Sequence, residues 1–268
     1  MGMAWLSKNH REINMDINAL AREQFRLDCN CLIEEPGGIM INESREREGA
    51  RKVETISPFF RAIIYKGDAY IMADKSIIDW VREQYEDCMP EWFCKFENLR
   101  KLDRKLNEYG YEINDTHVYM LPDREFEDSE YEELPYDAYW LYDKEIMEWG
   151  KKYGQNNPFN HALVFSKTQP DRMALLLTEK GNKDRIAGMS GVSEDGKNLW
   201  QIGIDVMPEY RGHGLATYLT EMMKRKVLSI NKVPFYGTSE SHSLSMDTAV
   251  RSGFLPAWCE VYCSRIKE

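Results

Sequence analysis

An arginine and two glycines stand where a predicted strand gives way to a helix, and their types and spacing are suited to chemistry. The apolar strand ends at Val206, Pro208 cannot extend it, and Arg211 to Gly214 (R-G-H-G) then opens the helix. Glycines at a helix start let an anion reach the amide N–H groups of the first turn, which have no partner within the helix. The helix dipole and the Arg211 guanidinium add positive potential there. The pattern predicts a site for phosphate or pyrophosphate.

Two familiar nucleotide-binding loops do not fit this segment. A Walker A loop needs a Lys after its glycines, but Leu215 follows Gly214. A dinucleotide-binding fingerprint needs a third glycine, but Thr217 stands in its place. The predicted strands before the segment also meander instead of opening a βαβ unit. The pattern therefore argues against both of these ways of holding a nucleotide.

A second polar group follows the next predicted strand, which ends at Thr238. It consists of Ser239 to His242 (S-E-S-H), with Ser245 shortly after. Because a carboxylate can act as a general base and an imidazole can pass on a proton, Glu240 is the candidate base and His242 a candidate proton relay or cofactor contact. The same residues are also typical of a polar helix start whose serines cap amide groups. Both interpretations stay open.

Periodicity predicts the elements that position these residues. In chain order they are a helix at 139–153, strands at 173–179, 185–192 and 199–206, a helix at 212–227, a strand at 232–238, a helix at 245–252 and a last strand at 253–263. Meandering strands followed by crossovers favour a mixed sheet over a purely parallel one.

The first part of the chain is predicted to hold a separate set of elements. They are a helix within 11–29, a hairpin of strands at 60–65 and 69–73 that turns at Gly67-Asp68, helices after Asp74 and near 99–109, and a strand at 116–121. Between Glu125 and Glu133 six carboxylates then repel one another and stay hydrated, which is typical of a linker, although such a run could also attract a cationic substrate. We therefore expect an α+β domain of unknown role at residues 1–130 and a second domain at 131–268.

Two segments of the second domain resemble motifs of the GCN5-related N-acetyltransferase (GNAT) family. Val206 to Ala216 (V-M-P-E-Y-R-G-H-G-L-A) is similar to motif A, with its Q/R-x-x-G-x-G/A signature between a strand and a helix. Ala249 to Phe254 (A-V-R-S-G-F) is similar to the end of motif B. The resemblance covers roughly residues 139 to 268. It implies an α/β (α+β) fold in which a GNAT-like mixed, mostly antiparallel sheet is flanked by helices and preceded by the smaller N-terminal domain.

The resemblance also implies a cosubstrate and a reaction. Acetyl-CoA would give its acetyl group to a primary amine by direct attack, with no metal. Its pantetheine would pair with the backbone of Ile204 and Val206, its pyrophosphate would lie on amides of residues 211–216, and an amide near Val206 or Met207 would hold the oxyanion. The implied cofactor-binding residues are Ile204, Val206, Met207, Arg211, Gly212, His213, Gly214, Leu215, Ala216 and Ser245.

The sequence departs from better-known members of that family at two positions. Counting back from Gly253, His242 stands where many members have Asn, and Ala249 stands where they have a tyrosine acid. The missing tyrosine supports an alternative function, a non-catalytic acyl-CoA-binding sensor or interaction module. Transfer of a larger acyl group, or transfer to a hydroxyl, also stays open. Asp205 alternates to the opposite face of its strand, where it could hold an amine or lie at the surface.

Composition limits the partners. A net charge of −10 argues against a nucleic-acid binder and is compatible with a small-molecule or peptide amine as acceptor. The hydrophobic content of 43% excludes wholesale disorder. The six cysteines lack metal-ligand spacing, and no apolar run is long enough to cross a bilayer. We expect a cytoplasmic acetyltransferase without a membrane or nucleic-acid partner.

Overall fold

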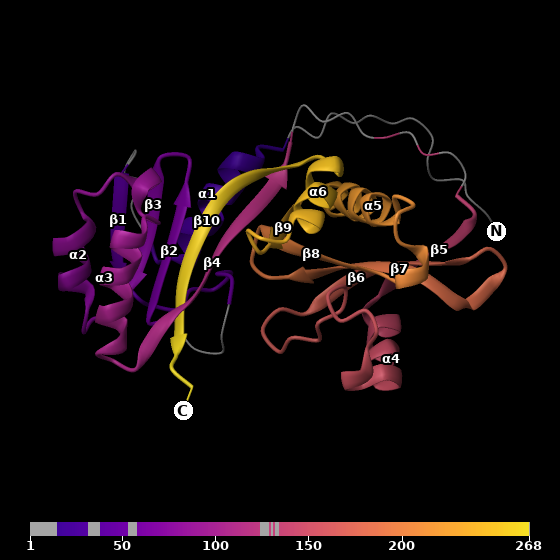
Figure 1. The fold of residues 1–268 in the computed structure, drawn as a ribbon, viewed down its shortest axis with the longest axis horizontal. Helices are drawn as coiled ribbons and strands as arrows, with labels where there is room; N and C mark the ends of the chain where they lie inside the picture. Colours follow the sequence, from indigo (N-terminus) through magenta and orange to yellow (C-terminus); the bar gives the residue numbers. More distant parts are fainter. Residues whose placement is uncertain are drawn as a thin grey trace.

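One mixed sheet organises the molecule. The computed structural model describes residues 15–31, 38–52, 58–123, 129, 131 and 134–267. Its ten strands form one sheet in the order β1-β3-β2-β10-β4-β9-β8-β7-β6-β5 (Figure 1). Neighbouring strands are antiparallel except for the pairs β1–β3 and β8–β9. A mostly antiparallel sheet flanked by helices confirms the predicted fold class.

The first half of the chain covers its strands on both faces. Its elements are α1 (Ile17–Asp28), β1 (Gly38–Glu43), β2 (Phe60–Tyr65), β3 (Asp68–Ala73), α2 (Ile78–Tyr85), the 3-10 turn η1 (Pro90–Trp92), α3 (Phe96–Asn107) and β4 (Tyr111–Pro122). Side chains alternate along β2, so Ile63 packs against α1 while Ala62 packs against α2 and α3. The predicted hairpin is confirmed, but its turn is Lys66-Gly67, both at positive φ, rather than Gly67-Asp68, because Asp68 already pairs with Tyr65. Strand β1 was not predicted.

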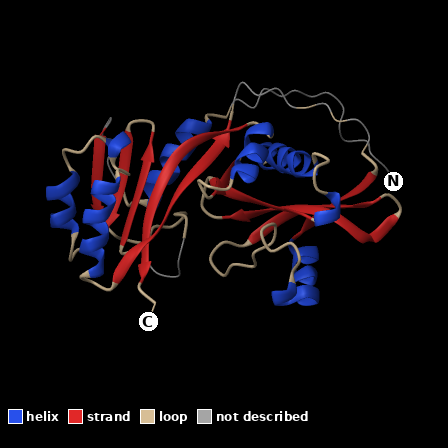
Figure 2. Cartoon of the chain, in the orientation of Figure 1, coloured by secondary structure: helices blue, strands red, loops and turns tan. Residues whose placement is uncertain are grey.

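The second half places two helices on one face of the sheet and one on the other (Figure 2). Its elements are β5 (Tyr136–Tyr142), α4 (Asp143–Tyr153), η2 (Gly154–Asn156), β6 (Asp171–Glu179), β7 (Asn182–Glu194), β8 (Leu199–Val206), η3 (Pro208–Tyr210), α5 (Leu215–Ser229), β9 (Val233–Thr238), α6 (Ser243–Arg251) and β10 (Phe254–Arg265). Helices α5 and α6 pack on one face, and α4 packs on the other.

The start of the predicted helix at 139–153 is wrong, because residues 136–142 form strand β5. Trp140 packs toward the core under α5, whereas Tyr139 and Leu141 pack toward α4. Both faces of β5 are therefore covered, which removes the polar positions that normally mark a strand.

The last strand joins the two halves. β10 lies between β2 and β4, so residues 254–265 pair with strands from residues 60–122. The two predicted domains thus share one sheet, and their division near residue 130 stays a prediction. Beside that boundary, the buried carboxylate of Glu221 on α5 accepts hydrogen bonds from the Ser129 amide at 2.7 Å and the Tyr131 hydroxyl at 2.6 Å. The predicted acidic linker carboxylates lie outside the described residues.

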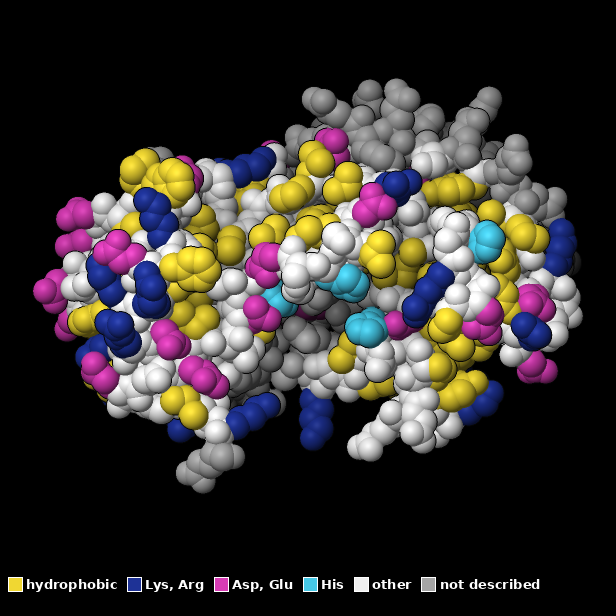
Figure 3. Space-filling model, in the orientation of Figure 1, with side chains coloured by type: hydrophobic (Ala, Val, Ile, Leu, Met, Phe, Trp, Pro, Cys, Tyr) yellow, Lys and Arg dark blue, Asp and Glu magenta, His cyan; other side chains and the backbone are white. Residues whose placement is uncertain are grey.

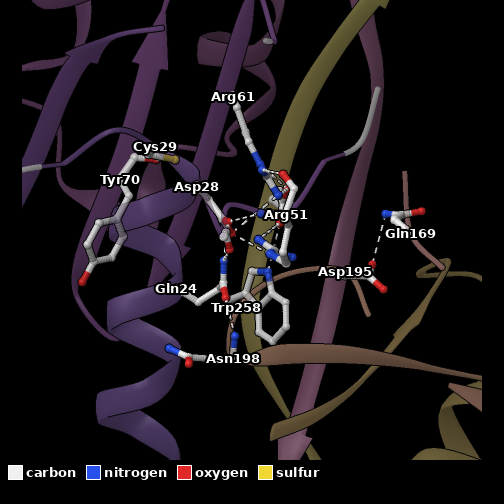
Figure 4. A network of polar contacts seen from close by, with 12 residues as sticks. Gln24, Asp28, Cys29, Arg51, Arg61, Tyr70, Gln169, Asp195, Asn198 and Trp258 are labelled. Atoms are coloured by element: carbon white, nitrogen blue, oxygen red, sulfur yellow. Dashed lines mark hydrogen bonds and ion pairs between the residues drawn. The ribbon is translucent and has the colours of Figure 1, made fainter. Parts of the chain in front are cut away.

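A buried network of charged side chains ties α1 and β2 to β10 (Figure 4). Arg51 lies between two carboxylates, with Nε 2.6 Å from Asp28 Oδ2 and a terminal nitrogen 2.9 Å from Glu260 Oε2. Arg61 Nε donates to Glu260 Oε1 at 2.6 Å. Burial alone would raise the pKa of Glu260, but Arg51 and Arg61 lower it to about 2. The network therefore consists of buried acidic and basic side chains that pair with one another.

All six cysteines are free thiols, and the Sγ atoms of Cys94 and Cys259 lie 3.5 Å apart. No helix in the described part of the chain is both long and apolar enough to span a bilayer.

Candidate active site

The parallel pairing of β8 with β9 stops partway along both strands. It runs from Leu199–Val233 to Ile202–Tyr236. β8 continues to Val206, whereas the end of β9 pairs on its other side with β4, where Thr238 faces Val118. The two strands are thus split beyond Ile202, and among the described residues no strand lies beside this part of β8 on that edge.

The register of β8 decides which backbone groups face the split. The Met207 amide donates to the Ala187 carbonyl at 3.0 Å, on the β7 side. Because hydrogen-bonded pairs alternate in an antiparallel ladder, the backbone groups of Ile204 and Val206 point the opposite way, toward β9. The Met207 amide is therefore not directed at the split. The Met207 amide already has an acceptor within the sheet, and the oxyanion role expected of an amide near Val206 or Met207 stays a prediction.

The predicted anion-binding segment lies directly after β8. Gly212 and Gly214 have φ values of +82° and +76°, which a side chain disfavours, and no atom lies within 4 Å of a Cβ placed on either. The first helical bond of α5 runs from the Tyr218 amide to the Gly214 carbonyl, so the amides of Leu215 and Ala216 precede it.

The side chains of this segment add a cation to those amides. Arg211 is exposed, and its Nε donates to the Val206 carbonyl at 3.0 Å. His213 is exposed as well. An open, positively polarised helix start therefore adjoins the split.

On the β9 side of the split, carboxylates gather around a histidine. Glu240 lies in the turn after β9, where its Oε1 accepts from the Thr116 hydroxyl of β4 at 3.5 Å. His117 Nδ1 lies 3.4 Å from Asp115 Oδ2. One atom each of Asp115, His117 and Glu240 fall within 4.8 Å of one another. These three residues, here called the β4–β9 cluster, could hold an ammonium group or a metal ion. Figure 3 shows histidines beside acidic side chains around a hollow near the middle of this face.

His242 and Ser245 lie at the start of α6 and have separate partners. His242 is the exposed N-cap residue, whose carbonyl accepts from the Ser245 amide at 3.0 Å but whose ring caps no amide. The Ser245 hydroxyl lies 3.0 Å from that of Tyr236, the last residue of β9 to pair with β8. Burial raises the pKa of Tyr236. Ser245 is thus held beside the start of the split.

On the β8 side, Asp205 holds a histidine that the sequence did not single out. Its Oδ1 lies 2.7 Å from His161 Nδ1, and its Oδ2 accepts from the amides of His161 at 2.9 Å and Ala162 at 3.0 Å. The contact depends on Gly191 and Gly203, which face each other across β7 and β8 only in the folded register.

Comparison with known proteins finds a family model that resembles part of the chain. The model of the acetyltransferase (GNAT) family matches residues 124–241. No curated protein sequence matches the chain.

Some solved structures are similar at low sequence identity. A GCN5-related N-acetyltransferase from Kribbella flavida is 13% identical, with a TM-score of 0.44 over 62% of this chain and 64% of that one. Another from Sphaerobacter thermophilus is 13% identical, with a TM-score of 0.39 over 62% and 56%. A Drosophila protein is 12% identical, with a TM-score of 0.47 over 74% and 69%. The family model spans β8, the helix start of α5 and β9, so residues 124–241 of the chain resemble the acetyltransferase (GNAT) family.

Proposed function

We propose that the protein transfers the acetyl group of acetyl-CoA to a primary amine. The observation that carries this proposal is the end of β8–β9 pairing at Ile202–Tyr236, directly beside the open helix start at Gly212 and Gly214. Acetyl-CoA supplies the acetyl group as a thioester when it is bound there.

The residues present fit such a cosubstrate. The backbone groups of Ile204 and Val206 face the split and can pair with the pantetheine amides as an added strand would. The amides of the first turn of α5 can hold the pyrophosphate. Arg211 uses Nε on the Val206 carbonyl, which leaves its other N–H groups to reach a phosphate.

The charges around the split support an amine as the acceptor. Asp115 and Glu240 lie on its β9 side and Asp205 on its β8 side. Negative side chains on both sides attract an ammonium group and disfavour an anionic acceptor. We propose that Glu240 helps to hold the ammonium, and that His242 contacts the cosubstrate or relays a proton. The acceptor is a small molecule or a peptide that carries a primary amine.

Cosubstrate binding tests the helix start. We expect Gly214→Val to weaken acetyl-CoA binding at least tenfold in titration calorimetry, because a β-branched residue is strained at this φ and its side chain obstructs the amides. Gly110→Val is the matched control, since Gly110 has a φ of +76° with nothing within 4 Å but lies after α3. Equal affinity of both variants and the wild type for acetyl-CoA would show that the cosubstrate does not bind at the start of α5.

Turnover separates catalysis from sensing. Thiol release from acetyl-CoA is measured with small amines, polyamines, aminoglycosides and lysine peptides. Release above the rate without an acceptor, with mass-spectrometric detection of the acetylated amine, is the expected result. Tight binding of acetyl-CoA without turnover on any acceptor would favour the acyl-CoA sensor instead.

A further inference from the structure

The loop that carries His161 is held at both ends by one buried side chain. Asn157 Nδ2 donates to the carbonyls of Phe159 at 3.0 Å and Leu163 at 2.9 Å. Its Oδ1 accepts from Trp149 Nε1 at 2.9 Å and from the Phe159 amide at 3.1 Å. A buried amide with four hydrogen bonds makes the loop at 157–163 a rigid support.

The middle of the same loop lies on a glycine pair. A Cβ on Gly203 would lie 1.8 Å from the His161 carbonyl oxygen, and a Cβ on Gly191 would lie 1.7 Å from that of Ala162. Any side chain at these positions would lift the loop from the sheet. The two glycines therefore allow His161 to come within reach of Asp205.

Asp205 sets the protonation pattern of the imidazole. Its Oδ1 is 2.7 Å from His161 Nδ1, so a proton on Nδ1 is held by the carboxylate and Nε2 carries the free lone pair. The His161 side chain is 77% exposed, whereas that of Asp205 is 17% exposed. Within the described residues no side chain or backbone group bonds Nε2. The pair presents an oriented proton acceptor to the solvent.

The position of Asp205 places this acceptor at the split. Asp205 lies between Ile204 and Val206, whose backbone groups face the split and whose side chains pack toward α5. Asp205 points to the opposite face, which is the side of α4. Acetyl-CoA lying along Ile204 and Val206 would thus place its diphosphate at the start of α5. His161 would then face its thioester from the α4 side of the sheet.

Glu240 is less suited to the same task. It lies exposed in a turn, its one printed hydrogen bond among the described residues is the 3.5 Å bond from Thr116, and Asp115 and His117 lie in the same cluster. Neighbouring carboxylates attract an ammonium group but do not orient one acceptor atom.

We infer that His161 is the general base of the proposed acetyl transfer and that Asp205 is its positioning residue. His161 Nε2 takes one proton from the substrate ammonium, and the neutral amine forms the C–N bond to the acetyl carbon. As the C–S bond breaks, the second amine proton passes to the sulfur, which leaves as the free thiol. His161 then gives its proton to water. This inference rests on the proposed function and adds the residue that makes the amine nucleophilic.

The test uses the full chain with acetyl-CoA and an amine that the wild type acetylates. We expect His161→Gln to lower kcat about 100-fold, in the range typical of general base catalysis, and to remove the acidic limb of the pH–rate profile. The dissociation constant of acetyl-CoA should stay within about twofold, because no cosubstrate contact is lost. Imidazole added to His161→Ala should restore part of the rate, since the ring lies exposed.

Two carboxylate substitutions separate positioning from folding. Asp205→Asn should lower kcat about tenfold. If the Asn oxygen keeps the two backbone amides, its NH2 group faces Nδ1 and donates to it, which moves the imidazole proton to Nε2. Asp171→Asn is the matched control. The Asp171 carboxylate accepts from the Phe165 amide at 2.8 Å, just after the loop at 157–163, and it does not contact His161. This variant should leave kcat and the pH profile unchanged.

Three results would overturn the inference. Full kcat and an unchanged pH profile in His161→Gln would show that another group is the base, while wild-type turnover would keep the proposed function. Loss of the acidic limb in Glu240→Gln, with His161→Gln unaffected, would assign the base to Glu240. Wild-type protein that binds acetyl-CoA but acetylates no amine would remove both the function and the base.

Discussion

Two groups of charged residues in this molecule use the same side-chain types in opposite ways. In the buried network, Arg51 and Arg61 neutralise Asp28 and Glu260, and all four side chains are almost fully shielded from solvent. At the split, Asp205 holds an exposed His161 whose Nε2 stays available. Complete mutual pairing stabilises the sheet, whereas incomplete pairing beside an open edge leaves a group that can react. The partners and the exposure of a charged side chain, rather than its residue type, decide whether it supports the fold or can take part in a reaction.

The strongest way to break this comparison is to remove one cation of the network. Arg61→Met leaves Glu260 buried with one arginine fewer, and we expect a loss of about 3–5 kcal/mol in the free energy of unfolding. Urea denaturation of both proteins measures it. The control is Arg172→Met, because Arg172 pairs with Glu194 at 2.6 Å but is 42% exposed. It should cost at most about 1 kcal/mol. Equal losses would show that burial does not distinguish the two pairs.

A buried carboxylate that forms no ion pair with an arginine among the described residues sharpens the comparison. Asp195 is buried and accepts from Ser193 Oγ at 2.6 Å and Gln169 Nε2 at 3.1 Å. Burial raises its pKa from 3.8 to about 6, whereas the arginines lower that of Glu260 to about 2. Asp195 binds its proton more tightly in the native than in the unfolded protein. Its protonation therefore favours the fold most below pH 3.8. That contribution is lost as the pH rises through 6.

We therefore expect the free energy of unfolding of Asp195→Asn to exceed that of the wild type at pH 8 by up to about 3 kcal/mol. The gap should shrink as the pH falls from 6 toward 3.8. Thermal and urea denaturation across this range measure it, with the exposed Asp184→Asn as control. A gap that does not change with pH would contradict the raised pKa.

The two regions also differ in how far the sequence predicts them. The helix start could be predicted because Arg211, Gly212 and Gly214 are nearly consecutive and act through local backbone geometry. The buried network could not, because Arg51 and Glu260 are 209 residues apart and meet only when β10 pairs with β2. Local rules carry no information on such pairing.

His161 lies between these two cases. Its partner Asp205 was considered from strand alternation, but the contact depends on the glycine pair Gly191–Gly203, which becomes a pair only in the folded register. Strand β5 was missed for a related reason, since apolar side chains that are partly buried on both faces erase alternation. The roles of Glu240 and His242, the cytoplasmic location and the domain division stay predictions.

A glycine substitution tests whether the loop support matters at the split. Gly203→Ala places a Cβ against the backbone of His161, so the loop must shift, and we expect a loss of about 1–3 kcal/mol in stability. If His161 is the base, kcat per folded molecule should fall, while the affinity for acetyl-CoA is retained. The control is Gly150→Ala, where the new Cβ meets only the ring of Phe165, which can rotate away. An unchanged kcat at saturating acetyl-CoA and amine would show that the position of the loop does not affect catalysis.

The smallest expected effect concerns one hydroxyl pair at the start of the split. Tyr236→Phe and Ser245→Ala each remove the 3.0 Å hydrogen bond between these residues, and each should lower the free energy of unfolding by about 1 kcal/mol. Their effects on acetyl-CoA should differ. If Ser245 contacts the cosubstrate, Ser245→Ala weakens binding about five- to tenfold, whereas Tyr236→Phe frees the serine hydroxyl and leaves the affinity equal or tighter. Calorimetric titration of both variants decides between the two roles, because a purely structural pair would weaken binding equally in both.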